Sequence, residues 1–230
     1  MKIGIIGAMD EEIALLKEEM IISHEVVYAQ ITFYEGTYQG RNIVLCKSGV
    51  GKVNASITTQ LLIDKFLVDN IIFTGVAGAL DPDLNVGDVV ISTSAMQHDI
   101  DASPLGFKKG EIPMFHRSSE FIADEQLVTL AEKAAAVIKG KTKRGKILSG
   151  DQFIADHHLV LSLHEQFQGT CVEMEGAAVA QVAALNEIPF VIIRSISDKA
   201  NHEAQMSFEE FTVLASTQSH AMVKHIVSQL

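Results

Sequence analysis

The chain has 230 residues, with 18 Lys and Arg against 29 Asp and Glu, and a formal net charge of −11. Hydrophobic residues make up 47% of it and charged residues 20%, which is the composition of a globular protein rather than a disordered one. The acidic balance argues against a nucleic-acid partner, because that binding needs Lys and Arg to neutralise phosphates. No apolar run approaches the roughly 20 residues of a membrane span, so we expect no membrane contact.

Apolar runs with strand and helix periodicity alternate along the chain. Residues 2–8 predict a buried strand, and the acidic residues from Asp10 onward suit the first turn of a helix. Residues 95–119 show no periodicity, and so long a loop in a compact domain indicates a functional or interface segment. The other expected elements are strands over 25–36, 41–48, 70–74, 88–94 and 189–196, a strand that starts at 146, and helices over 52–66, 120–138, 176–186 and from Ser207. This order predicts one α/β domain over residues 1–230, with a mixed sheet flanked by helices.

Two cysteines are too few for a disulfide framework. Cys46 and Cys171 each lie in an apolar, strand-like run, where we expect a buried reduced thiol. Reduced thiols are typical of cytoplasmic proteins, so the sequence favours that compartment.

Several short segments look like known functional motifs but do not match them. Residues 49–53 look like part of a phosphate-binding P-loop, but Cys46 and Val53 stand where that motif needs Gly and Ser or Thr. Neither a zinc-protease HExxH helix nor a GxSxG nucleophile elbow occurs. Neighbouring His and Asp residues at 98–101, and the pair at 157–158, could ligate a metal, but a solvated or structural role is the simpler interpretation. We expect no metal site.

Polar side chains follow several predicted strands, at the edge where α/β sheets bind ligands. Glu12 follows the first strand, and Asp198 lies just past the last one. Glu173, Glu175, Arg194 and Ser197 complete this set. Several carboxylates in one crevice are costly unless they are protonated, paired or used on a substrate. Helix capping explains one such carboxylate, whereas three such positions with an arginine predict an active site.

Seven motifs in order then become informative together. They are GIIGAMDEE over 4–12, SGVGKVN over 48–54, GVAGA over 75–79, GD over 87–88, SGDQFI over 149–154, VEMEG over 172–176 and RSISD over 194–198. With these motifs the chain, over essentially its whole length, closely resembles the bacterial 5′-methylthioadenosine/S-adenosylhomocysteine nucleosidases of the nucleoside phosphorylase superfamily. The resemblance implies a three-layer α/β/α fold with a central mixed sheet, and a homodimer. It also implies hydrolysis of the adenine–ribose bond of both nucleosides, as in methionine salvage, without a metal or an organic cofactor.

The resemblance implies roles for three carboxyl groups. Cleavage of an N-glycosidic bond passes through an oxocarbenium-like state and needs an acid on the leaving base and a base on the attacking water. The match makes Asp198 the acid at adenine N7, which requires a proton that burial can retain by raising the pKa. It makes Glu12 the base for water. Glu175 falls where the family binds the ribose hydroxyls, and a carboxylate can accept from both at once.

The remaining implied site residues surround these three. Phe153 corresponds to the residue that stacks on adenine, and the Ile154 backbone to its edge contacts. Arg194 corresponds to a residue that helps hold Glu12 and the water, and Ser197 to one that supports Asp198. The implied substrate-binding set also includes Ala77, Gly78, Glu173, Met174 at the ribose, and Met9, Val50 and Phe208 at the 5′-alkylthio group. A plain core role is the alternative for Met9, Val50, Met174 and Phe208.

The resemblance also implies a role for the aperiodic residues 95–119. In this family the equivalent segment reaches across the dimer and closes the neighbour's site. Leu105, Phe107 and Pro113 are therefore candidates for a pocket wall supplied to the partner chain.

Three alternatives to this nucleosidase remain. A purine nucleoside phosphorylase would need arginines and hydroxyl donors for phosphate, but the N-terminal loop is acidic and position 76 is Val where many relatives carry Ser. Similar short motifs occur in the subgroup that cleaves aminofutalosine in menaquinone synthesis. A non-catalytic nucleoside-binding protein would be expected to have lost Glu12 or Asp198, and both are present.

Overall fold

The computed structural model describes residues 1–199 and 204–230. Its described strands are β1 (Lys2–Gly7), β2 (Ile21–Tyr28), β3 (Ile31–Tyr38), β4 (Arg41–Lys47), β5 (Asn70–Ala79), β6 (Val89–Gln97), β7 (Glu120–Ile122), β8 (Thr142–Ser149), β9 (Gly169–Glu173) and β10 (Phe190–Asp198). Its described helices are α1 (Asp10–Glu19), α2 (Lys52–Phe66), α3 (Glu125–Lys133), α4 (His157–Phe167), α5 (Gly176–Leu185) and α6 (Ala204–Gln229), with 3₁₀ helices η1 (Ser103–Leu105) and η2 (Ala134–Val137).

All of these strands belong to one mixed sheet, as predicted. β1 pairs in parallel with β4 and β5, and β5 pairs in parallel with β10, whereas β10 and β6 are antiparallel. The pairings continue from β6 to β8 and β9 and return to the end of β5. This half of the sheet therefore closes on itself, while β4, β3 and β2 extend beyond β1.

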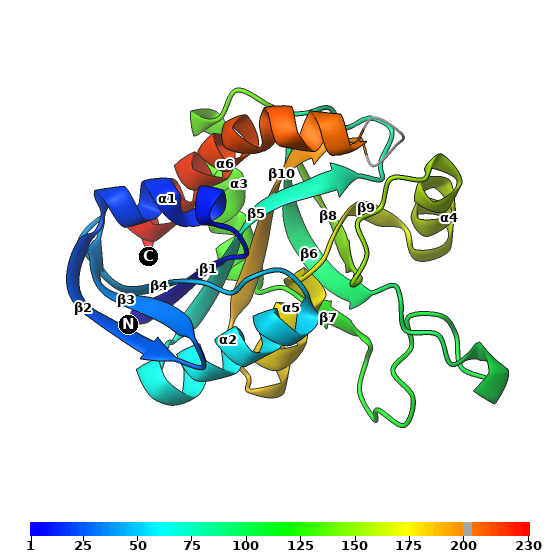
Figure 1. Ribbon diagram of the computed structural model, residues 1–230, viewed down its shortest axis with the longest axis horizontal. Helices are drawn as coiled ribbons and strands as arrows, with labels where there is room; N and C mark the ends of the chain where they lie inside the picture. The colour runs from blue at the N-terminus through cyan, green and yellow to red at the C-terminus, as the bar shows by residue number, and fades with distance from the viewer. Residues whose placement is uncertain (200–203) are drawn as a thin grey trace.

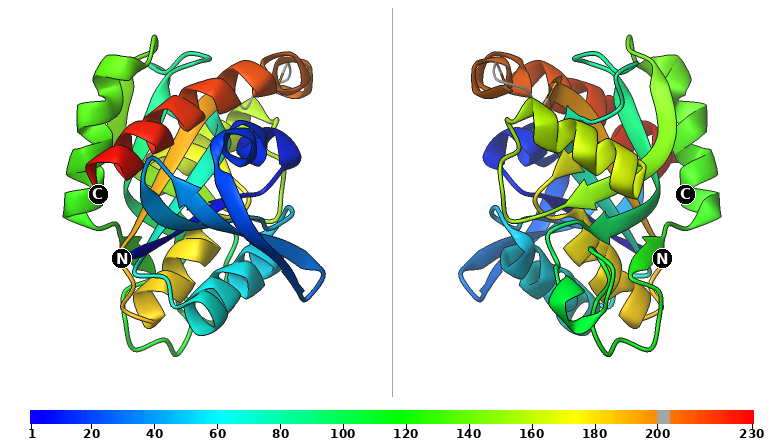
Figure 2. Two further views of the ribbon diagram at one scale, coloured as in Figure 1. Left: turned by 90° about the vertical axis from the view of Figure 1, so that its left-hand side faces the viewer. Right: turned by 90° about the vertical axis from the view of Figure 1, so that its right-hand side faces the viewer.

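Helices cover both faces of the sheet. Figures 1 and 2 show α1, α3 and α6 on one face, with α2 and α5 on the other and α4 beside β9. Because both faces are covered, apolar residues follow one another along the strands, and Ile3, Ile5 and Ile6 of β1 are all buried. The predicted three-layer α/β/α fold is confirmed.

The prediction of a helix over 120–138 was wrong at its first residues. Residues 120–122 pair antiparallel with β6 as β7. The Asp124 side chain accepts hydrogen bonds from the backbone N–H groups of Gln126 and Leu127 at 3.0 Å each, and so caps a shorter helix. α4 was not predicted at all, β8 begins four residues before Lys146, and α6 begins at Ala204 rather than Ser207.

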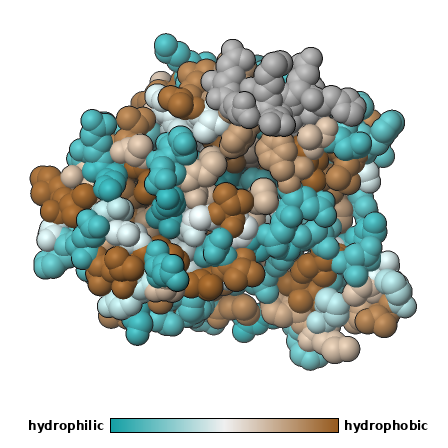
Figure 3. All heavy atoms as spheres, in the orientation of Figure 1, coloured by the Kyte–Doolittle hydropathy of each residue, from teal (hydrophilic) through white to brown (hydrophobic). Residues whose placement is uncertain are grey.

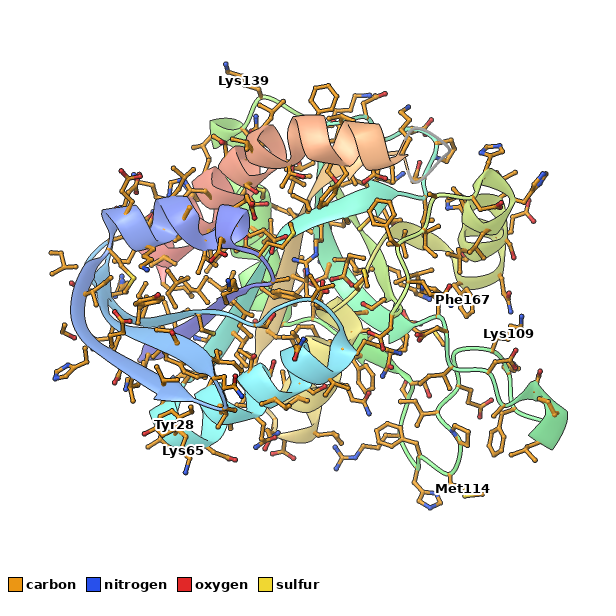
Figure 4. All side chains as sticks on the ribbon, in the orientation of Figure 1. Tyr28, Lys65, Lys109, Met114, Lys139 and Phe167 are labelled. Atoms are coloured by element: carbon orange, nitrogen blue, oxygen red, sulfur yellow. The ribbon has the colours of Figure 1, made fainter. Side chains whose placement is uncertain are left out.

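Three further features bear on the sequence predictions. Residues 98–119 contain only the short η1 and project from the body, where Figure 4 labels Lys109 and Met114. Cys46 and Cys171 are both buried and free. Within the described ranges, the chain has no helix with the length and apolar character needed to cross a membrane.

Candidate active site

The carboxyl ends of β1, β5, β9 and β10 surround one pocket. Its lining residues are Ala8, Met9, Glu12, Val50, Val76, Ala77, Gly78, Phe153, Val172, Glu173, Met174, Glu175, Ser197, Asp198 and Phe208. Most of the residues that sequence reasoning selected are therefore brought together. Ala8 and Val172 were missed, because small and apolar residues at strand ends carry no chemical signal of their own.

Glu12 lies in the first turn of α1 and points into this pocket. Its Oε2 accepts hydrogen bonds from the N–H groups of Ala8 (2.5 Å) and Met9 (3.0 Å), and its Oε1 accepts one from Val76 (3.0 Å). A carboxylate has about four acceptor sites, so one remains to take a proton from a ligand. Burial raises the pKa of Glu12 above its usual value, although Arg194 and the three backbone donors oppose the shift.

Glycine at position 75 allows this arrangement. A Cβ at Gly75 would collide with the Glu12 carboxylate, so the backbone of β5 can approach Glu12 only without a side chain there. The contact to Val76 is made by the backbone N–H. At position 76, Val in place of the Ser of many relatives therefore leaves this hydrogen bond to Glu12 unchanged and removes only a hydroxyl from the pocket wall.

Glu175 precedes α5 and is buried at the pocket. Its Oε1 accepts a hydrogen bond from the Gly51 N–H at 2.8 Å. About three acceptor sites then remain, enough for two vicinal hydroxyl groups. Burial and the neighbouring Glu173 carboxylate raise the pKa of Glu175 to about 8. Sequence reasoning missed Gly51, because it contributes only a backbone group.

Glu173 differs from these two carboxylates because its oxygens are already engaged. Arg194 donates to Oε2 from Nη2 (2.6 Å) and Nε (3.2 Å), and the N–H of Gly176 donates to both oxygens (2.7 and 2.9 Å). Ser149 Oγ also donates to Glu173 and accepts from the N–H of Ala177 at 2.7 Å. Glu173 therefore anchors Arg194 and the start of α5, where the helix dipole favours an anion. It also lines the pocket, and its expected contact with substrate stays a prediction.

Arg194 lies beneath the pocket instead of lining it. Its guanidinium is fully buried and stacks 3.9 Å from the centre of the Phe73 ring. Nη1 donates to the Ile193 carbonyl at 3.2 Å. Although burial raises the pKa of Glu12, the charge of Arg194 acts to lower it, and the expected role of Arg194 in holding the water stays a prediction. Ser149 was missed as part of this support, although it ends a predicted strand.

Asp198 ends β10 and is buried at the pocket. Pairing with β5 shifts register between Ile196 and Asp198, and such a bulge re-aims side chains. Ser197 and Asp198 consequently both line the pocket although they are adjacent. Ser197 Oγ donates to Asp198 Oδ2 at 2.9 Å, which agrees with the predicted supporting position.

An apolar wall closes the remaining side. The Phe153 and Phe208 rings meet edge to face, with centroids 5.7 Å apart and planes at 82°. Val50 is 49% exposed, so the alternative core role does not fit it. Met9 and Met174 are half-buried and line the pocket as well.

Besides Arg194, four predicted residues lie outside this pocket. Ile154 lines an adjoining small cavity with Gly78 and Asp198. Leu105 is 71% exposed on the projecting segment, and Phe107 and Pro113 also lie apart from the pocket of their own chain. Their assignment to a partner's pocket stays a prediction.

The candidate metal ligands differ in their contacts. Asp99 accepts a hydrogen bond from Lys52 Nζ at 2.6 Å, whereas the buried Nε2 of His98 has no hydrogen-bond partner among the described residues. Across residues 1–199 and 204–230, no three His, Cys, Asp or Glu side chains gather as a metal-binding group.

Comparisons with known proteins agree over the whole chain. Residues 2–228 match the sequence model of the phosphorylase superfamily. The chain is 46% identical over 230 residues to the 5′-methylthioadenosine/S-adenosylhomocysteine nucleosidase of Halalkalibacterium halodurans, with 100% of this chain and 99% of that one covered. The crystal structure of the nucleosidase of that name from Neisseria meningitidis, in complex with methylthio-immucillin-A, matches with TM-score 0.95 and 40% identity over 100% and 99% of the two chains. The native structure of futalosine hydrolase of Helicobacter pylori strain 26695 matches with TM-score 0.94 and 36% identity over 100% and 98%.

Proposed function

The chain belongs to the phosphorylase superfamily, and we propose that within it this protein hydrolyses the N-glycosidic bond of 5′-methylthioadenosine and S-adenosylhomocysteine. Water would add to the anomeric carbon, the bond to adenine N9 would break, and adenine and the 5-thioribose product would leave. Full-length identity of 46% to a nucleosidase of this activity supports the proposal. The products suit methionine salvage, and no metal or organic cofactor enters the reaction.

One observation favours water over phosphate as the nucleophile. Among the described residues, the charged groups that line the pocket are all carboxyl groups, and neither Lys, Arg nor His is present in the lining. Arg194 is buried against Glu173 and does not line the pocket. A phosphate dianion would meet carboxylates without a compensating cation, which disfavours the purine nucleoside phosphorylase alternative.

In this proposal each carboxyl group has one task. Glu12 orients water and accepts its proton, because one acceptor site remains after its three backbone bonds. Asp198 protonates adenine N7 as the base departs. Glu175 binds the ribose hydroxyls, and its ionised form favours the cationic sugar of the transition state.

The apolar wall accommodates the rest of the substrate. Phe153 stacks on adenine, while Met9, Val50 and Phe208 contact the 5′-alkylthio group. Met174 packs on the ribose, and Ala77, Gly78 and Ile154 complete the purine side.

We further infer a cytoplasmic homodimer in which each chain forms one domain over residues 1–230. The main buried core runs from Ile3 to Val227, which supports a single domain. Figure 3 shows hydrophobic residues gathered over α2, where Val53 and Ile57 are exposed. Such a surface supports a subunit interface, across which Leu105, Phe107 and Pro113 would reach the partner's pocket. The two free buried thiols support a reducing compartment.

Incubation of the purified protein with each nucleoside, followed by chromatography for adenine, tests the function. Release from methylthioadenosine and adenosylhomocysteine is expected, and absence of release from both would refute it. Aminofutalosine belongs in the same assay, because the match to a futalosine hydrolase makes cleavage of that nucleoside the second candidate. A far higher kcat/KM for aminofutalosine than for methylthioadenosine would favour that alternative.

A further inference from the structure

Three residues outside the pocket form a closed ring of polar contacts, in which Asp99, after β6, joins the start of α2 at Lys52 to the loop after β8 at Asp151. Lys52 Nζ donates to Asp99 Oδ1 at 2.6 Å, and the Asp151 N–H donates to Asp99 Oδ2 at 3.0 Å. The Lys52 N–H donates to Asp151 Oδ1 at 2.9 Å, and Lys52 Nζ lies 3.9 Å from Asp151 Oδ2. None of these three residues lines the pocket.

Each joined loop carries a group that the proposed reaction uses. Gly51 directly precedes Lys52, and its N–H donates to Glu175 Oε1 at 2.8 Å. Phe153 lies two residues after Asp151. Gly51 has φ +99°, and a Cβ there would lie 3.3 Å from Asp151 Oδ1. The two loops therefore approach each other where the ring joins them, and movement of Lys52 would move the N–H that holds Glu175.

The Lys52–Asp99 ion pair is largely shielded from solvent, so it can hold the two loops in place. The side chains of Lys52 and Asp99 are 16% and 18% exposed, so water and salt screen the pair less than a surface pair. Although burial acts to raise the pKa of Asp99, the hydrogen bonds from Lys52 and Asp151 hold it below its usual value. Asp99 is thus ionised at neutral pH.

We propose that Asp99 is a positioning residue for the cleavage reaction: its two oxygens hold Lys52 and Asp151, and so fix the Gly51 N–H on Glu175 and the Phe153 loop against the base. This inference rests on the proposed function. It assigns to Asp99 no contact with substrate. Loss of its charge should release both loops together, and small displacements of binding groups cost large factors in rate.

The test compares Asp99→Asn with Lys52→Met, which breaks the same ring from the other side. For methylthioadenosine we expect kcat/KM to fall by about 10- to 100-fold in each, with more of the loss in KM than in kcat because Glu12 and Asp198 are untouched. Lys52→Met provides the measurement if Asp99→Asn does not fold. Glu120→Gln is the matched control. It breaks a half-buried pair with Lys146 (2.8 Å; side chains 34% and 20% exposed) away from the pocket, and should alter Tm but not kcat/KM.

A double-mutant cycle with Glu175→Gln separates positioning from general destabilisation. If Asp99 acts through Glu175, the fall in kcat/KM from Asp99→Asn should shrink several-fold in the Glu175→Gln background. An undiminished loss in that background, or kcat/KM within twofold of wild type in both ring variants, would overturn the inference. Calorimetric binding of a non-hydrolysable methylthioadenosine analogue by the same proteins gives the comparison without turnover. Failure of the wild type to release adenine would count against the proposed function, whereas the ratio of variant to wild-type affinity tests the ring.

Discussion

The Arg194 guanidinium donates two hydrogen bonds to a single carboxylate oxygen of Glu173, from Nη2 at 2.6 Å and from Nε at 3.2 Å. Both side chains are buried, and Glu12 and Glu175 are further charges near the same guanidinium. One cation beneath several carboxyl groups lets them share a pocket. Arg194 therefore compensates the negative charge of these carboxyl groups.

Glu173→Gln should strongly destabilise the fold. Removal of one partner leaves a buried charge without its ion pair, which costs about 3–5 kcal/mol, or a fall in Tm of roughly 6–20 °C for a domain of this size. Thermal unfolding by calorimetry measures this shift. Glu18→Gln makes the same chemical change at an exposed position and should leave Tm almost unchanged. Equal Tm values for the two variants would show that the Glu173–Arg194 pair carries little stability.

Glu12→Gln should remove most turnover, because an amide cannot accept the proton of the attacking water. General-base catalysis contributes about 10²–10⁴-fold, so kcat for adenine release should fall by that factor while circular dichroism stays native. In the variant, the amide NH₂ group faces backbone N–H groups whose hydrogen bonds the carboxylate now accepts. Because this contact can lower stability, Tm is measured in parallel. Near-wild-type kcat would show that Glu12 is not the base.

Asp198→Asn should also lower kcat by about 10²–10⁴-fold, and its effect should depend on the leaving group. A 5-methylthioribosyl substrate with a phenolate leaving group of low pKa needs no protonation to depart. We expect the ratio of wild-type to variant kcat to be much smaller for that substrate than for methylthioadenosine. The same ratio for both substrates would contradict a role as general acid.

Glu175→Gln should stabilise the protein increasingly as pH rises. The pKa of Glu175 is about 8 in the fold against an ordinary value of 4.5. The folded state therefore keeps a proton that the unfolded chain loses, and wild-type stability falls as pH rises through this window. The glutamine variant lacks this loss and still accepts from Gly51. Its Tm relative to wild type should gain at least about 2–4 °C between pH 5 and pH 9, the shift that ~1 kcal/mol produces.

The control for that pH series is again Glu18→Gln, whose Tm relative to wild type should stay constant. A constant difference for Glu175→Gln would mean that Glu175 titrates normally. The variant should also bind nucleosides more weakly than wild type above about pH 8, where wild-type Glu175 is ionised, because the ribose hydroxyls then lose a charged acceptor.

Sequence reasoning located the carboxyl groups because strand ends in α/β sheets follow directly from apolar runs. Glu12, Glu175 and Asp198 each come just after such a run, and the structure brings them to one pocket. The arrangement of Glu12 and Asp198 follows the parallel pairing of β1, β5 and β10, which the alternation of strands and helices anticipates. Glu175 follows β9, which pairs antiparallel with the end of β5. The mixed sheet flanked by helices was predictable on the same grounds, whereas the three-layer arrangement was expected from the family resemblance.

The sequence predictions fall short where contacts between residues far apart in the chain determine the structure. Glu173 becomes the partner of Arg194 because β9 and β10 both pair with β5. The position of Arg194 in the chain does not reveal that partner. Backbone donors such as the Gly51 and Val76 N–H groups leave no side-chain signal. The helix expected from residue 120 shortened because β7 pairs with β6 and Asp124 caps the helix later. Neither helical periodicity nor composition contains those contacts.

The central claim is that water, and not phosphate, attacks the anomeric carbon of an adenine nucleoside. Turnover of methylthioadenosine in H₂¹⁸O with added phosphate, followed by mass spectrometry of the sugar product, tests it most directly. The account predicts free 5-methylthioribose with one ¹⁸O at C1, formed at a rate that phosphate does not change. A 5-methylthioribose 1-phosphate product, or adenine release that requires phosphate, would contradict it.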